Sequence, residues 1–131
     1  MKLISIFAVL FFGAIVSASD VGFKLSMDLI INNQHVSAPD VTVKEGEKAS
    51  VIQRLPNSSD SAFINVIAKR EKKNAVLMTF VVGTIANGKR TVLSKPRVVT
   101  LFGEKAEVSQ VSDSATGETI TLAVTPTQVA L

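Results

Sequence analysis

The sequence predicts an all-β fold, an antiparallel β-sandwich or small barrel built from two duplicated four-stranded modules. Short segments of alternating apolar residues are separated by turn residues, which is typical of strands. The chain also repeats itself, because Gly-Glu-Lys-Ala at 46–49 recurs at 103–106, an offset of 57 (103 − 46). The same offset pairs Pro39 with Pro96, Val41 with Val98 and Val51 with Val108.

The amino-terminal segment has the three parts of a secretory signal. Lys2 precedes an apolar run over residues 3–16, and small residues follow at Ser17 and Ala18. The run is shorter than the roughly 20 residues that span a bilayer, and cleavage after Ala18 fits the small-residue rule. We therefore expect a signal peptide over 1–18 and a periplasmic or secreted mature chain without a transmembrane anchor.

The first module is predicted over residues 19–68. Apolar residues alternate from Phe23 to Ile31, which predicts a half-buried strand, and residues 32–35 (Asn-Asn-Gln-His) predict a turn. Val41 and Val43 lead into the turn at Gly46, and we expect a hairpin there with the strand that follows. A polar loop over 54–61 precedes a further apolar strand at 63–67.

Residues 69–75 contain the charged run Lys-Arg-Glu-Lys-Lys, which predicts a linker or a solvated hairpin tip. The second module follows over 76–131. Its Asn87-Gly88 pair favours a type I′ turn, because both residues tolerate positive φ. We expect Met78, Phe80 and Val82 to repeat the roles of Phe23, Leu25 and Met27, and Ile120, Leu122 and Val124 those of Ile64, Val66 and Ala68. The two modules are expected to pack face to face.

The segment from Leu93 to Val108, with the strand over 120–126, resembles part of the bacterial secretins, which are outer-membrane secretion channels. The similarity lies in a strand of the type Ser-x-Pro-Arg-Val-x-Thr with an Ala-x-Val segment after it. It covers about thirty residues of the second module. The resemblance implies a Gram-negative envelope location and a β-hairpin at this place. We do not expect this segment by itself to form a channel.

The residues give little support for catalysis, and we expect no enzymatic activity, no cofactor and no metal. His35 is the only histidine and there is no cysteine, whereas zinc sites and His-assisted hydrolases need such residues in groups. The glutamates near the two glycine turns are expected to be solvated charges. All aromatic residues are phenylalanine, which argues against base stacking and thus against nucleic acid.

The second module is more basic than the first at matched places. Arg97 stands where the first module has Asp40, and Lys89-Arg90 stands where it has Gln34-His35. The period of two puts Lys95 and Arg97 on one strand face. We therefore expect Lys89, Arg90, Lys95 and Arg97 to form the partner-binding surface, opposite an acidic patch on another protein.

These features predict an exported, non-enzymatic β protein that binds another envelope protein, such as an outer-membrane channel component. Its expected role is that of an accessory component of a bacterial secretion, pilus or conjugation apparatus. Two alternatives stay open. One is a structural subunit that polymerises by strand exchange through a free edge such as Val21–Ile31. The other is an enzyme inhibitor.

Overall fold

The protein is all β over the residues that its computed structural model describes, which are 21–56, 58–112 and 117–130. The predicted signal peptide at 1–18 lies outside them. The described residues include no helix long and apolar enough for a membrane crossing. The strands are β1 (Val21–Ile31), β2 (Gln34–Ser37), β3 (Asp40–Lys44), β4 (Lys48–Arg54), β5 (Ser61–Lys72), β6 (Ala75–Ala86), β7 (Lys89–Ser94), β8 (Arg97–Leu101), β9 (Ala106–Val111) and β10 (Thr119–Ala130).

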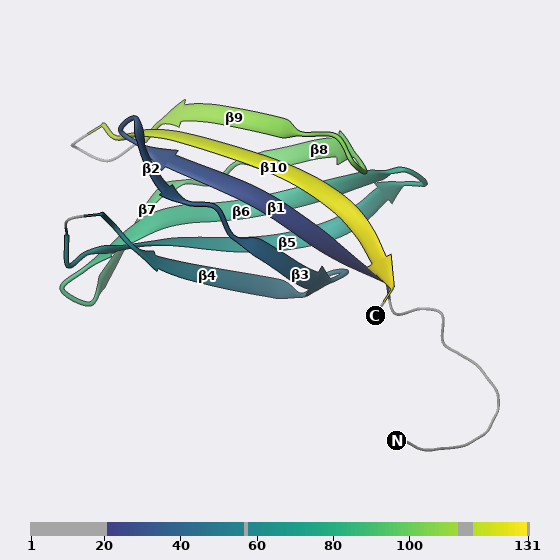
Figure 1. The fold of residues 1–131 in the computed structure, drawn as a ribbon, viewed down its shortest axis with the longest axis horizontal. Coiled ribbons are helices and arrows are strands. Elements are labelled where there is room, and N and C mark those ends of the chain that lie inside the picture. The colour runs from purple at the N-terminus through teal and green to yellow at the C-terminus, as the bar shows by residue number, and fades with distance from the viewer. Residues whose placement is uncertain (1–20, 57, 113–116, 131) are drawn as a thin grey trace, which may run out of the picture.

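The strands form two antiparallel sheets that face each other. In the first sheet, β2 and β3 both pair with β1, and β10 and β9 follow in that order. In the second sheet, β7 and β8 both pair with β6, and β5 and β4 follow. Figure 1 shows β1 and β10 side by side in one layer, crossing over β5 and β6 in the other. The prediction of an antiparallel β-sandwich is confirmed.

The core lies between the two sheets and is filled from the inward positions of the long strands. Alternation along β1 sends one set of side chains inward and the other outward, since successive side chains point to opposite faces. The side chains that are less than 2% exposed include Phe23, Leu25, Leu29, Ile64, Val66, Val76, Met78, Phe80, Val82, Leu122 and Val124. The apolar alternation predicted from Phe23 to Ile31 is thus the core face of β1.

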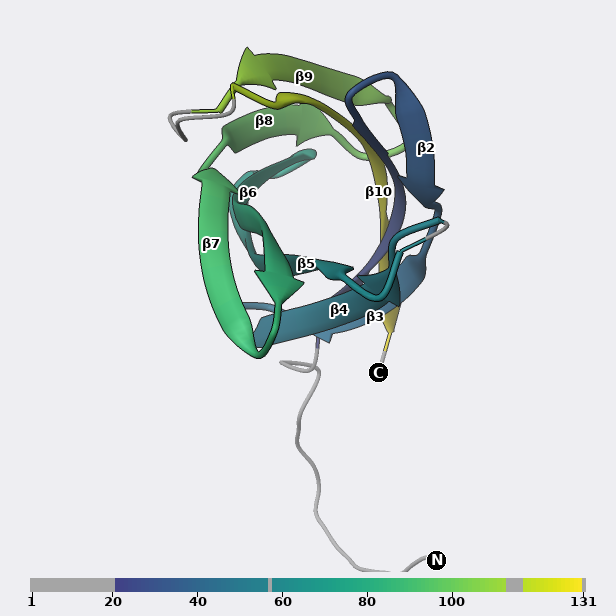
Figure 2. The ribbon, with the colours of Figure 1, turned by 90° about the vertical axis from the view of Figure 1, so that its left-hand side faces the viewer.

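The turns at Gly46 and Gly103 are corners between the sheets, and the prediction of a hairpin at each was wrong. The strand before Gly46, β3, pairs with β1, whereas β4 pairs with β5 in the other sheet. Gly46 has a φ of 82° and Gly103 a φ of 83°, which favours glycine. The amide of Gly46 donates to the carbonyl of Ala68, and that of Gly103 to the carbonyl of Pro126. Figure 2 shows β3 beside β4, and β8 beside β9, where the chain changes sheet.

Each half of the chain contributes five strands, not four, and the halves do not form one sheet each. A proline explains the extra strand: Pro39 separates β2 from β3 and Pro96 separates β7 from β8, because proline cannot donate to the ladder. The strand after each corner joins the opposite sheet, so β9 and β10 complete the sheet that β1 begins. The halves therefore interlock instead of packing as separate face-to-face sheets.

The two halves follow the same path with matched pairing. Leu25 pairs with Val41 and Pro126, and Met78 pairs with Val98 and Ala68. The residue numbers of equivalent positions therefore differ by 53 between β1 and β6 (78 − 25), by 57 between β3 and β8 (98 − 41) and by 58 between β5 and β10 (126 − 68). A common origin of the halves stays a prediction that this matching supports.

Two predicted correspondences were wrong by two residues. Met78, Phe80 and Val82 are equivalent to Leu25, Met27 and Leu29, whereas Ile120, Leu122 and Val124 are equivalent to Ala62, Ile64 and Val66. The first shift arises because the β6–β7 hairpin is longer than the β1–β2 hairpin. Its two additional pairs are Ile85 with Arg90 and Ala86 with Lys89.

The charged run at 69–75 belongs to the hairpin of β5 and β6. Lys69 to Lys72 extend β5, and the turn at Lys73 and Asn74 leads into β6. The ladder shifts register between Arg70 and Lys72. The side chains of this run are exposed, as their charge requires.

The first hairpin turn offers a test of backbone strain. Asn32 and Asn33 have φ values of 53° and 63°, as Asn87 and Gly88 do at 54° and 76°. Asn32 also accepts a hydrogen bond from the amide of Thr119 at 3.0 Å, so it has a second role. We expect Asn33→Gly to leave the free energy of unfolding unchanged or raised by about 0.5 kcal/mol, and Asn33→Val to lower it by about 1–2 kcal/mol. Urea denaturation measures the free energy of unfolding of both variants. If Asn33→Val is as stable as Asn33→Gly, residue 33 does not have a positive φ.

Candidate protein-binding face

The two sheets have outer faces of opposite character. On the first sheet the outward positions of β1 and β3 are mostly polar, as Lys24, Asp28, Thr42 and Lys44 show. On the second sheet many outward positions are apolar. This apolar face consists of Ile52, Phe63, Ile67, Leu77, Val81, Val99 and Leu101.

The apolar face spans four strands, with polar residues among its members, and is partly open to solvent. Val99 pairs directly with Leu77, and Leu101 follows on the same side of β8. Val99 is 56% exposed, Leu101 47% and Ile52 55%. Two polar residues on this outer face, Ser50 and Asn65, are hydrogen-bonded to each other, since the Ser50 hydroxyl donates to the Asn65 amide oxygen at 2.7 Å. Large exposed apolar side chains on one face of a sheet are found at interaction sites.

Comparison of equivalent positions shows that the fold does not require this apolar face. All seven members have polar counterparts on the first sheet. In the order given above, the counterparts are Ser109, Thr121, Thr125, Lys24, Asp28, Thr42 and Lys44. Since both sheets have the same strand order, the sandwich itself does not require apolar residues at these positions.

Phe63 anchors one end of the apolar face. It points away from the core but is only 2% exposed. The ring lies over Gly83, its cross-strand partner, and the Arg90 guanidinium covers it with its carbon 4.8 Å from the ring centroid. This is cation–π geometry. The two additional residue pairs of the β6–β7 hairpin include Arg90, so the first sheet has no counterpart of this arrangement.

The four predicted partner-binding residues are all exposed, but they do not form one cluster on a single strand. Arg97 pairs with Thr79 and lies beside Val99 on the outer face. Arg90 lies on the same face over Phe63, whereas Lys89 is at the hairpin end, paired with Ala86. Lys95 lies between β7 and β8, so the prediction that it shares a strand face with Arg97 was wrong. Pro96 ends the pairing there.

The apolar face was not predicted, although the sequence contains a signal for it. Along β1 the apolar residues alternate with polar ones, whereas along 62–67 and 75–85 apolar residues occupy both parities. Apolar residues at both parities indicate a strand that is apolar on both faces. In a two-layer sandwich only one of those faces meets the core.

The described histidine and carboxylate side chains do not form a catalytic or metal-binding group. His35 Nε2 is hydrogen-bonded to Asp28 on the outer face of the first sheet, with both side chains about half exposed. Glu45 accepts a hydrogen bond from the Arg70 amide at 2.7 Å, which is a structural role at the corner. Among residues 21–56, 58–112 and 117–130 no group of three or more His, Asp or Glu side chains could hold a metal ion.

The strand suggested for polymerisation is not a free edge. Every residue of Val21–Ile31 pairs with β10 on one side, and most also pair with β2 or β3 on the other. The free edges of the described sheets are instead short strands, as is usual for soluble sheets.

No protein-family model matches the chain, and no curated protein or solved structure is significantly similar to it.

Proposed function

We propose that this chain is an exported, non-enzymatic protein-binding domain and that the apolar face of the second sheet receives the partner. The observation that carries the proposal is the contrast between equivalent positions. Leu77, Val99 and Leu101 stand where the first sheet has Lys24, Thr42 and Lys44. Removal of apolar surface from water is the main favourable contribution to most protein–protein association.

The charges around the apolar face define the partner. The outward positions of β4, β5, β7 and β8 include five cations, which are Lys48, Arg54, Lys69, Arg90 and Arg97. Up to Lys69, no outward position of these four strands is acidic, and Glu71 lies at the end of β5 where the ladder shifts register between Arg70 and Lys72. Two such faces would repel each other in a symmetric dimer. The occupant that fits is therefore a different protein with an apolar centre and an acidic rim.

The wider role that we propose is that of an accessory component of a bacterial envelope secretion, pilus or conjugation apparatus. The signal-like segment at 1–18 and the secretin-like segment at 93–108 support it. In the structure the secretin-like segment forms the corner at Gly103, with Arg97–Leu101 and Ala106–Val111 in different sheets, instead of the hairpin that the resemblance implies. The support therefore comes from the sequence similarity alone. An envelope protein such as a channel component is the partner class that these features favour.

Exchanging residues between the two sheets tests the proposal. The variant Leu77→Lys/Val99→Thr/Leu101→Lys gives the apolar face the residues of the first sheet. We expect its free energy of unfolding to change by less than about 2 kcal/mol, because all three side chains are at least partly exposed. Affinity capture from the envelope of the producing cell, quantified by mass spectrometry, should lose the partner that the wild type captures.

The matched control adds two lysines to the other outer face. Thr42→Lys/Ser109→Lys raises the net charge equally at exposed positions of the first sheet, and it should capture the partner as the wild type does. Capture by the wild type should weaken with salt, since the rim is charged. Equal capture by the apolar-face variant would place the binding surface elsewhere.

A further inference from the structure

A cleft opens between the edges of the two sheets, apart from the apolar face. Its walls are β7, which pairs only with β6 in the described chain, and β9, which pairs only with β10. The cleft has a volume of about 430 Å³ and is lined by Val92, Leu93, Ser94, Lys95, Gln110 and Val111.

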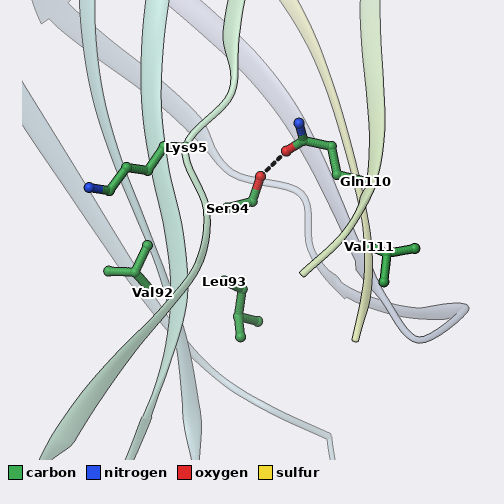
Figure 3. A pocket seen from close by; sticks show the side chains of 6 residues that line it. All are labelled: Val92, Leu93, Ser94, Lys95, Gln110 and Val111. Atoms are coloured by element: carbon green, nitrogen blue, oxygen red, sulfur yellow. Dashed lines mark hydrogen bonds between the residues drawn. The ribbon is translucent and has the colours of Figure 1, made fainter. Parts of the chain in front are cut away.

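Figure 3 shows how the cleft is built. The Ser94 hydroxyl donates to the side-chain oxygen of Gln110, and this bond ties the two edges together at one end. Leu93 is 4% exposed and forms the floor. Val92 and Val111 stand on opposite walls, and they are 45% and 69% exposed. The cleft therefore has a closed polar end and an apolar mouth.

The equivalent place in the first half has the same floor but a different mouth. At the offset of 57, Val36, Ser37 and Gln53 are equivalent to Leu93, Ser94 and Gln110, so the apolar floor residue and the Ser and Gln recur. At the mouth, His35, Ala38 and Arg54 are equivalent to Val92, Lys95 and Val111. The fold thus tolerates polar residues at the mouth, and the two valines are not needed to close the sandwich.

The edge strands and the side chains that line the cleft are suited to bind an extended peptide. Each wall is an edge strand, and the free side of an edge strand can pair with an added strand. The mouth offers aliphatic side chains, and among the described residues that line the cleft Lys95 is the only charged one. A strand that presents an aliphatic side chain next to a carboxylate matches both features.

We propose that this cleft binds an extended segment of a partner protein by strand addition. An aliphatic side chain of the segment lies between Val92 and Val111, and a neighbouring carboxylate pairs with Lys95. The inference goes beyond the proposed function, because it concerns an edge of the sandwich instead of the apolar face. It does not require that face to bind anything.

Titration of the ¹⁵N-labelled mature protein with a synthetic peptide tests the inference by NMR. The probe has about eight residues, the usual length of a strand, and alternates valine with threonine and glutamate. The control peptide has prolines in place of the threonines, so that it cannot pair as a strand. We expect saturable shifts of the amides from Val92 to Lys95 and at Gln110 and Val111 with the probe alone. Absence of saturable shifts there would overturn the inference.

Exchange of the mouth residues provides the matched variants. Val92→His/Lys95→Ala/Val111→Arg copies the first half and should bind the probe at least about tenfold more weakly, a loss of about 1.4 kcal/mol. The fold should survive, since the same residues occupy the equivalent positions. The reverse variant His35→Val/Ala38→Lys/Arg54→Val should gain shifts in β2 and β4. Undiminished binding by the first variant would also refute the cleft.

The apolar-face variant separates this inference from the proposed function. Leu77→Lys/Val99→Thr/Leu101→Lys should bind the probe as the wild type does. If the probe instead shifts Leu77 and Val99, the cleft is not its site and the inference fails, while the apolar face remains a binding surface.

Discussion

Replacement of Phe80 by alanine should lower the free energy of unfolding by about 3–5 kcal/mol, the usual cost of removing a fully buried phenylalanine. Phe80 is 0% exposed and points from the middle of β6 into the core between the sheets. Its amide donates to the carbonyl of Pro96 at 2.9 Å, so the backbone around it is also fixed and cannot close the cavity easily. Equilibrium denaturation in urea, monitored by circular dichroism, measures the loss.

Two further substitutions serve as controls for this prediction. Thr79→Ala alters the next residue of the same strand, but Thr79 is exposed on the outer face, and its cost should stay below about 1 kcal/mol. Met27 is equivalent to Phe80 and is 4% exposed, so Met27→Ala should cost about 2–5 kcal/mol. If Phe80→Ala and Thr79→Ala cost the same, Phe80 does not face the core.

The local features of the fold could be predicted from the sequence because their causes are local. Alternation from Phe23 to Ile31 identifies β1 and its buried face, since the side-chain period of a strand is two. The Asn87-Gly88 pair identifies a hairpin turn, because both residues have positive φ there.

The partners of each strand could not be predicted, because the same turn chemistry serves two purposes. A glycine at positive φ can close a hairpin within a sheet or turn the chain into the opposite sheet. At Gly46 the choice depends on contacts with the distant strands β1 and β5, whose atoms accept hydrogen bonds from Glu45 and Gly46. No pattern near residue 46 contains that information.

The candidate site, like the fold, could be predicted only in part from the sequence. Comparison of charges between the repeats identified Arg90 and Arg97, which do lie on the outer face of the second sheet. No prediction was made for the apolar residues of this face, because a hydrophobic residue in a strand is ordinarily expected to be buried. Only the pairing of the strands shows that Leu77 and Val99 point away from the core.

Gly83→Ala is the second substitution with a large expected effect, and it tests the end of the apolar face. A methyl group at Gly83 would collide with the carbonyl oxygen of Thr91 and lie 2.7 Å from the ring of Phe63. The carbonyl belongs to the backbone of β7 and cannot rotate away, so strands β6 and β7 must separate locally. Overpacking of this kind usually costs 1–3 kcal/mol, and we expect about 3 kcal/mol here. Urea denaturation measures this loss as well.

The control is Gly103→Ala, because the two glycines are constrained for different reasons. Gly103 has a φ of 83° and no atom within 4 Å of the added methyl group, so only backbone strain of about 1–2 kcal/mol is expected. Gly83→Ala should also push Phe63 from under Arg90 and shift the ring resonances of Phe63 in NMR spectra, whereas Gly103→Ala should leave them in place. If Gly83→Ala is as stable as the wild type, Phe63 does not lie over Gly83, and this anchor of the apolar face is lost.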